Sequence, residues 1–143
     1  MLVDANLLLY ARNKRDPRHD PARDWLSVAL NGTTRIGLPW LSLTAFVRIA
    51  TNPRAFATPL TPDEATSQVM EWLGAPAAWV PVPTPRHAEV FTELVRRYRV
   101  TGALVTDAHL AALAMEHGVE VASTDADFSR FREVRWVDPL SAS

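Results

Sequence analysis

Residues 101–131 read TGALVTDAHLAALAMEHGVEVASTDADFSRF, and this stretch carries the main indication of the fold. Residues 107–117 are almost all apolar, which predicts a helix that is covered on most of its sides. Gly118 ends this helix, residues 119–122 form a short apolar strand, and residues 123–127 form a polar loop. A covered helix followed by a short apolar strand is typical of an α/β fold.

Short apolar strands and helices alternate through the rest of the chain as well. We expect strands at residues 1–3, 35–38, 78–82, 119–122 and 135–137. We expect helices directly after residue 4 and at residues 19–30, 41–50, 62–73, 86–98 and 107–117. Thr61-Pro62-Asp63-Glu64 combines a capping box with a proline at the first helical position, which is the clearest local signal. The alternation predicts one α/β domain over residues 1–143, with a central parallel β-sheet flanked by α-helices.

The composition excludes several classes of function. The chain of 143 residues has no cysteine, so disulfide scaffolds, zinc–thiolate sites and thiol nucleophiles are ruled out. No apolar run approaches the roughly 20 residues that span a bilayer, and no basic leader precedes the first apolar run. We therefore expect a soluble, cytoplasmic protein without a membrane partner. The net charge of -1 means that any site for nucleic acid must be local.

Aspartates follow two of the expected strands. Asp4 comes after the apolar residues 1–3, and Asp125 comes after the strand at residues 119–122. In open parallel sheets the ligand crevice lies beyond the carboxyl ends of the strands. Asp107 opens the late helix, so the assumed topology brings three carboxylates together, with no lysine or cysteine beside them. Such an oxygen-only site suits Mg²⁺ or Mn²⁺, which can activate water and polarise a phosphoryl oxygen.

Each of these acids also has a purely structural explanation. Asp4 and Asp125 are residues that form turns through hydrogen bonds to the backbone. Asp107 in the first turn of a helix complements the helix dipole without any catalysis. Asp127 is an acid in a loop, where acids are common. Spacing alone leaves both explanations open, because Asp4 lies about 100 residues before the other acids and only folding can gather them.

Four segments resemble the VapC branch of the PIN-domain family and occur in the family's order. They are LVDANLLLYA at residues 2–11, GLPWLSLTAFVRIATNPRAF at 37–56, the stretch at 101–131, and WVDPL at 136–140. The resemblance implies a PIN-like fold and the toxin of a type II toxin–antitoxin system. It further implies a Mg²⁺- or Mn²⁺-dependent endoribonuclease acting on transfer or ribosomal RNA. The implied partners are a VapB-type antitoxin and a second copy of the chain.

The resemblance also assigns roles to individual residues. Asp4, Asp107 and Asp125 fall on the family's metal-site aspartates, which makes them the expected catalytic residues and metal ligands. Asp127 lies two residues further and is expected to assist as a fourth ligand. Asn6 falls on a polar position that typically supports the site.

Two further residues receive roles from the same comparison. Thr124 occupies the second polar position that supports the site in the family. Arg48 is expected near the edge of the cleft, where it would touch RNA phosphate or an antitoxin carboxylate. A solvated or salt-bridged arginine is the alternative for Arg48.

One position departs from the family pattern. Relatives usually carry glutamate after the tryptophan of the central segment, whereas this chain has Leu41 between Trp40 and Ser42. Leucine cannot bind a cation, so Asp127, Ser42 or water would have to replace the missing acid. The alternative function is therefore a PIN-fold binding protein with weakened or no catalysis.

A second rival is a phospho-acceptor domain, since Asp4-Ala5-Asn6 faintly resembles a DxD motif. Such sites need a lysine near the phosphoryl oxygens. The single lysine, Lys14, lies in a polar stretch of the first connection, which disfavours this interpretation.

Overall fold

The computed structural model describes residues 1–141, which form five short strands, six α-helices and one 3₁₀ helix. The strands are β1 (Leu2–Val3), β2 (Ile36–Gly37), β3 (Ala78–Trp79), β4 (Val121–Ala122) and β5 (Trp136–Val137). The α-helices are α1 (Ala5–Arg12), α2 (His19–Leu30), α3 (Trp40–Ala50), α4 (Pro62–Leu73), α5 (His87–Tyr98) and α6 (Leu104–His117). The 3₁₀ helix η1 (Ala126–Arg130) follows β4.

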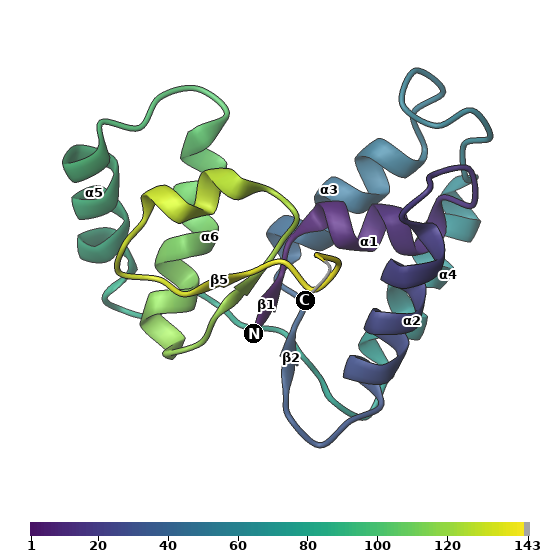
Figure 1. The fold of residues 1–143 in the computed structure, drawn as a ribbon, viewed down its shortest axis with the longest axis horizontal. Coiled ribbons are helices and arrows are strands. Elements are labelled where there is room, and N and C mark those ends of the chain that lie inside the picture. Colours follow the sequence, from purple (N-terminus) through teal and green to yellow (C-terminus); the bar gives the residue numbers. More distant parts are fainter. Residues whose placement is uncertain (142–143) are drawn as a thin grey trace.

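All strands pair in parallel, in the order β3-β2-β1-β4-β5. The first strand of the sequence is therefore the central strand of the sheet. Helices α1 to α4 lie on one side of the sheet, and α5, α6 and η1 lie on the other (Figure 1). The expected α/β architecture with a parallel sheet between helices is confirmed.

The strands send alternate residues into two apolar clusters, one on each face of the sheet. Leu2 packs with α5 and α6, whereas its neighbour Val3 packs with α1 to α4. Val121 and Ala122 divide in the same way on the adjacent strand. This division follows from the two-residue period of a β-strand, and both faces are covered as in other parallel sheets. The core therefore holds the carboxyl ends of β1 and β4 side by side.

Local signals in the sequence explain where several helices begin and end. Thr61 accepts a hydrogen bond from the Glu64 N–H at 3.1 Å, and Glu64 Oε1 accepts one from the Thr61 N–H at 3.0 Å. This capping box starts α4 at the expected residue. Gly118 ends α6 in the left-handed region with φ of 65°, which glycine adopts without strain. Asp4 caps the amino end of α1.

Several expected boundaries need correction, and among them the strand expected over residues 119–122 begins at Val121. Helix α6 begins at Leu104, so Asp107 is its fourth residue and lies in the first turn instead of opening the helix. The strand expected over residues 78–82 ends at Trp79, since Pro81 has no N–H to donate to a ladder. The polar loop expected over residues 123–127 is in part the start of η1. Within residues 1–141, every helix is too short or too polar to traverse a bilayer.

Candidate metal centre

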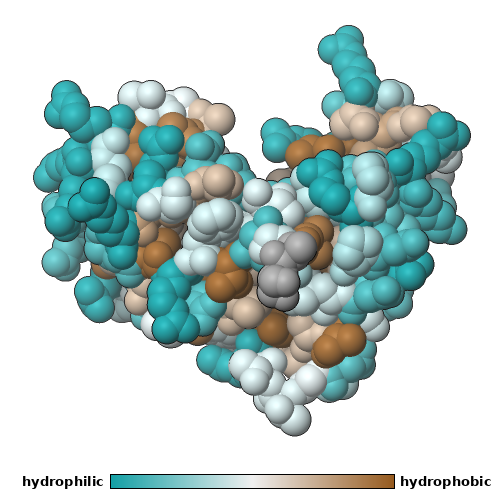
Figure 2. All heavy atoms as spheres, in the orientation of Figure 1, coloured by the Kyte–Doolittle hydropathy of each residue, from teal (hydrophilic) through white to brown (hydrophobic). Residues whose placement is uncertain are grey.

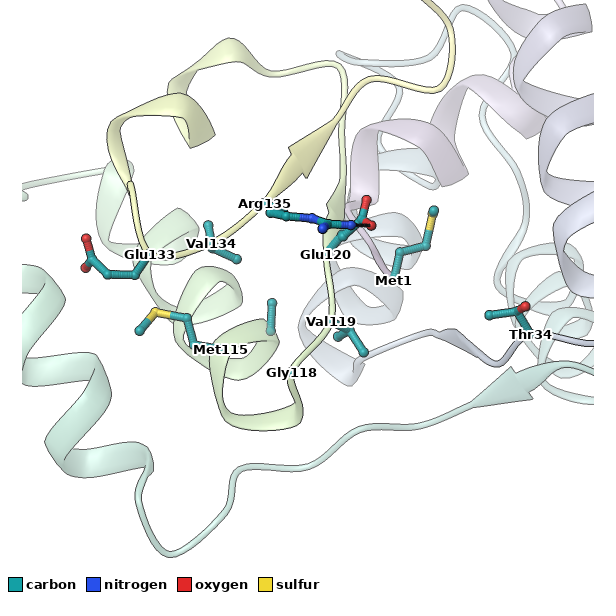
Figure 3. Close-up of a pocket in the computed structure, with 10 residues that line it drawn as sticks. Met1, Thr34, Met115, Gly118, Val119, Glu120, Glu133, Val134 and Arg135 are labelled. Atoms are coloured by element: carbon teal, nitrogen blue, oxygen red, sulfur yellow. Dashed lines mark hydrogen bonds and ion pairs between the residues drawn. The ribbon is translucent and has the colours of Figure 1, made fainter.

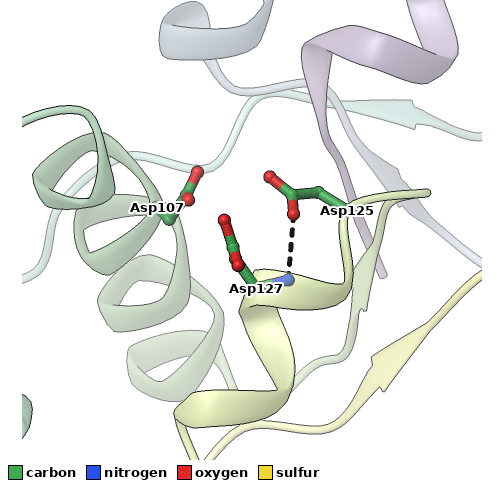
Figure 4. A group of neighbouring side chains, drawn as sticks. All are labelled: Asp107, Asp125 and Asp127. Carbon is green, nitrogen blue, oxygen red and sulfur yellow. Dashed lines mark hydrogen bonds between the residues drawn. The ribbon is translucent and has the colours of Figure 1, made fainter.

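Three aspartates meet where β4, η1 and α6 come together. Asp107 extends from the first turn of α6, Asp125 caps η1, and Asp127 lies within η1. One carboxylate oxygen from each lies within 4.8 Å of the other two (Figure 4). Asp125 Oδ1 also accepts a hydrogen bond from the Asp127 N–H at 2.9 Å, which fixes the start of η1. Folding therefore gathers these acids into one cluster, called here the acid cluster.

Asp4 lies at the carboxyl end of β1, beside this cluster. Its Oδ1 accepts a hydrogen bond from the Ala5 N–H at 2.8 Å, and its Oδ2 accepts one from Ser123 Oγ at 2.7 Å. The Asp4 charge contributes to the raised pKa of Asp107, so the two carboxylates influence each other electrostatically. Asp4 is outside the set of mutually close oxygens, but each of its oxygens retains a free lone pair.

Ser123 connects the two parts of the site, although sequence reasoning missed it. Its buried hydroxyl donates to Asp4 Oδ2 and accepts from Asn6 Nδ2 at 3.1 Å and from the Asp125 N–H at 3.0 Å. One donor and two acceptor positions are the full capacity of a hydroxyl. A signal was available in the sequence, because Ser123 follows β4 as Asp4 follows β1. The pairing of Val3 with Ala122 places these two residues side by side.

The two predicted supporting residues have different surroundings. Asn6 extends from the first turn of α1 toward Ser123 and uses its Nδ2 group there. Its Oδ1 atom is buried and has no hydrogen-bond partner among residues 1–141. Thr124 is only partly buried, and within the same residues its hydroxyl makes no hydrogen bond. The structure thus brings Asn6 into the site. At the end of β4 the hydrogen bonds that support the site come from Ser123 and not from the next residue, Thr124.

Ser42 and Leu41 show how the departure from the family pattern is accommodated. The buried Ser42 hydroxyl donates to the Val3 carbonyl at 2.6 Å, which anchors the start of α3 to the end of β1. This bond lies one residue before Asp4. Leu41 packs against the apolar cluster formed by α5 and α6 and offers no oxygen. Asp127, in contrast, places its carboxylate inside the acid cluster.

Arg48 lines a groove that none of the clustered acids lines. It lies in the last turn of α3 and lines a groove of about 410 Å³ between α3 and α4. Trp40 and Met70 line the same groove and are 53% and 68% exposed. The lining is almost entirely apolar, so the surface around Arg48 suits a protein partner better than RNA phosphate.

Burial and mutual repulsion alter the ionisation of the acids. Burial raises the pKa of Asp107 to about 6, and the charges of Asp125, Asp4 and Asp127 add to this shift. Burial also raises the pKa of Asp4, although the hydrogen bonds from Ser123 and Ala5 oppose the change. A bound cation would remove this repulsion, since it favours the ionised carboxylates.

The raised pKa of Asp107 predicts how the stability of the metal-free protein depends on pH. The folded state holds the Asp107 proton up to about pH 6, whereas the unfolded chain releases it near 3.8, so stability falls as pH rises through this interval. Because Asp107 is partly exposed, solvent screens its charge, and we expect a loss of only about 1–2 kcal/mol in the free energy of unfolding. Urea unfolding in EDTA between pH 4 and pH 7, compared with Asp107→Asn, measures this term. If the difference in unfolding free energy between the parent and Asp107→Asn stayed the same from pH 4 to pH 7, this prediction would be wrong.

The donor atoms fit a hard divalent cation. The three clustered carboxylates and Asp4 offer only oxygen, and the unpartnered Asn6 Oδ1 adds a neutral oxygen close to Ser123. Mg²⁺ and Mn²⁺ prefer such ligands, whereas Zn²⁺ and Cu⁺ favour sites with nitrogen or sulfur. The residues present therefore fit the cation that the family resemblance implies.

A large hollow of the described chain lies away from the acid cluster. It measures about 590 Å³ and lies near the amino ends of β1, β4 and β5, where Arg135 pairs with Glu120 (Figure 3). None of the clustered acids lines it. A separate indentation is visible between the half of the molecule with α5 and α6 and the half with α1 to α4 (Figure 2). The acids come from elements on both sides of this division.

Sequence comparison decides the family. The model of the PIN domain matches residues 1–134. The chain is 49% identical to ribonuclease VapC37 of Mycobacterium tuberculosis, over 96% of each chain. This chain belongs to the PIN-domain family, in its VapC branch. It is also 40% identical to ribonuclease VapC33 of the same species, over 98% of each chain. The opening, central, late and closing motifs of the sequence therefore identified the family correctly.

Solved structures share the fold. The VapC20 toxin of Mycobacterium tuberculosis, described as cleaving the sarcin–ricin loop, matches with a TM-score of 0.67 at 20% identity, over 94% of this chain and 98% of that one. VapBC2 of Rickettsia felis, solved with a promoter DNA fragment, matches with a TM-score of 0.66 at 16% identity, over 95% and 96% of the chains. These likenesses confirm the PIN-like fold of the VapC chain.

Proposed function

We propose that this VapC chain is the toxin of a type II toxin–antitoxin pair and an endoribonuclease that requires Mg²⁺ or Mn²⁺. The observation that carries the proposal is the acid cluster of Asp107, Asp125 and Asp127 beside Asp4. Relatives of nearly equal length that are named ribonucleases support the reaction type. Transfer or ribosomal RNA is the proposed substrate. The proposed unit is one domain over residues 1–143.

In this proposal Asp4, Asp107, Asp125 and Asp127 hold the cation, and Asn6 Oδ1 faces it or its water. A divalent cation at such a site lowers the pKa of water and polarises the phosphodiester. The chain's own contribution is to fix the ligands before substrate arrives. Ser123 holds Asp4 and the backbone of Asp125, and the Asp127 N–H holds the Asp125 carboxylate. Such positioning matters because misplaced ligands weaken both cation affinity and rate.

The proposed partners are a VapB-type antitoxin and a second copy of the chain. Structural neighbours include toxin–antitoxin complexes from Klebsiella pneumoniae and Rickettsia felis. We propose that the antitoxin covers the acid cluster and places a basic or aromatic side chain against it, because clustered carboxylates attract a cation. The apolar groove at Arg48, Trp40 and Met70 is a separate surface that suits a protein contact.

The test is RNA cleavage by the purified chain with Mg²⁺, with Mn²⁺ and with EDTA. We expect cleavage with either cation and none with EDTA, and the control variant Asp4→Asn should lose cleavage at the same cation concentrations. Leu41 supports the second candidate, a PIN-fold protein that binds its antitoxin without cutting RNA. Absence of cleavage over the whole range of both cations, with antitoxin binding retained, would favour this second candidate.

A further inference from the structure

Arg130 is a cation directly beside the acid cluster, and the mechanism above does not use it. It is the last residue of η1, three positions after Asp127. Its Nη2 atom lies 3.8 Å from Asp127 Oδ1, and 37% of its side chain is exposed. Its charge also lowers the pKa of Asp107, opposing the shift that burial and the other carboxylates cause. The guanidinium therefore acts on two members of the cluster.

A site made of carboxylates repels the substrate that it is proposed to cut. An RNA chain brings a negative phosphate for each nucleotide, and several ionised acids close together raise the cost of its approach. A cation at the rim offsets this repulsion, and guanidinium is well suited to the task because its donors match the oxygens of a phosphate. Arg130 lies at the place where such a cation is needed.

The contacts of Arg130 leave it free for this use. Its ion pair with Asp127 is longer than a hydrogen bond, and within residues 1–141 its side chain makes no hydrogen bond, so its five N–H donors remain available. Arg18 shows the opposite arrangement, since its guanidinium makes two hydrogen bonds of 2.9 Å to Asp16. Arg23 pairs with both Asp20 and Asp24. Arg130 thus lies near the cluster without a hydrogen bond to a carboxylate.

We propose that Arg130 binds a phosphate of the RNA substrate next to the acid cluster and so positions the chain for cleavage. This inference rests on the proposed endoribonuclease function. The alternative role is that of a counter-ion, in which Arg130 only balances the charge of Asp127. A carboxylate of the antitoxin is another possible ligand. RNA is favoured because the guanidinium adjoins the acids of the proposed cleavage centre, where a substrate phosphate must come, whereas the antitoxin is proposed to bring a basic or aromatic side chain to these acids.

The experiment compares Arg130→Gln with Arg132→Gln, a matched control from the same segment. Arg132 is exposed and makes no ion pair within residues 1–141. Binding of a fluorescent, mixed-sequence single-stranded RNA is measured by anisotropy in EDTA, where no cleavage occurs. We expect Arg130→Gln to bind about tenfold more weakly, with a salt dependence whose slope is shallower by about 0.7. Arg132→Gln should change affinity less than about threefold.

Cleavage kinetics and thermal melting complete the test. With Mn²⁺ present, Arg130→Gln should raise KM about tenfold and leave kcat within about threefold of the parent, because it removes binding without removing a cation ligand. Arg130→Lys should recover part of the loss, since it keeps the charge without the planar fork. Unchanged melting in EDTA would show that Arg130→Gln remains folded.

Several results would overturn the inference. Equal RNA binding by the parent and Arg130→Gln, with cleavage intact in the parent, would leave Arg130 as a counter-ion only. Equal losses in Arg130→Gln and Arg132→Gln would show a general effect of charge, and loss of antitoxin binding alone would assign Arg130 to the antitoxin. A parent that neither binds nor cuts RNA would overturn the proposed function, and this inference with it.

Discussion

Asp107→Asn is expected to lower RNA cleavage by about a thousandfold, which corresponds to about 4 kcal/mol of transition-state stabilisation. Asparagine keeps the shape of the side chain but loses the negative charge that is proposed to hold the cation. The loss should be large because Asp107 is part of the acid cluster: one of its oxygens is within 4.8 Å of oxygens from both Asp125 and Asp127. Single-turnover cleavage with saturating RNA, over a range of Mn²⁺ concentrations, is the measurement.

The same substitution is expected to make the metal-free protein more stable. At neutral pH the parent must keep Asp107 ionised although burial and three other carboxylates raise its pKa to about 6. Removing this charge should add about 1 kcal/mol to the free energy of unfolding in EDTA, or about 3 °C in the melting temperature. Loss of activity together with a gain in stability separates the loss of a ligand from misfolding.

Asp63→Asn is the matched control for Asp107→Asn. Asp63 also lies in the first turn of a helix, α4, but it is exposed and, within residues 1–141, belongs to no group of acids close enough to share a cation. We expect unchanged cleavage and a small loss of stability of about 0.3–1 kcal/mol, because the helix dipole favours a negative charge there. An Asp107→Asn protein that cuts RNA at the parent's rate would show that Asp107 does not hold the cation.

Ser123→Ala is expected to lower cleavage by about ten- to a hundredfold and to destabilise the fold by about 2–4 kcal/mol. The substitution removes one hydroxyl that serves Asp4 Oδ2, Asn6 Nδ2 and the Asp125 N–H. Each buried polar group left without a partner costs about 1–3 kcal/mol. Loss of a group that orients metal ligands typically lowers activity by about ten- to a hundredfold. Because Ser123 is fully buried, water cannot readily replace the lost contacts.

Thr124→Ala tests the specificity of that prediction. Thr124 is the next residue in the chain, and within residues 1–141 its hydroxyl makes no hydrogen bond. We expect a change of less than about 0.5 kcal/mol in stability and less than about threefold in rate. Urea unfolding in EDTA measures the stability of the parent and the two variants, and single-turnover cleavage measures their rates. Equal effects at the two positions would show that the contacts of Ser123 do not position Asp4.

Most of the fold could be predicted because its signals are local. The capping box at Thr61 and Glu64 and the terminating Gly118 set helix ends through contacts within a few residues. The start of α6 was placed three residues late, since Leu104 to Thr106 carry no capping signal and the helix begins without a side-chain cap. The strand ends were harder still, because a two-residue strand exists only through its neighbours in the sheet.

The acids of the site could be named from the sequence, but their arrangement could not be. Asp4 and Asp125 were expected at strand ends and Asp107 at the start of the late helix, and the resemblance added Asp127. The central place of Ser123 depends on the register between β1 and β4, which brings together residues 119 positions apart. The surroundings of Arg48 could not be predicted either, since only the packing of α3 against α4 shows that it lines an apolar groove.

The sequence by itself determined the alternation of strands and helices, the family, and the candidate acids of the site, because periodicity, capping and residue type are local properties of the chain. Only the tertiary structure decided that Ser123 ties Asp4 to the segment of Asp125, that Asp127 joins the cluster, and that Arg130 stands at its rim. These relations depend on strand register and on how α6 and η1 pack, and both are set by burial of apolar surface between segments far apart in the chain.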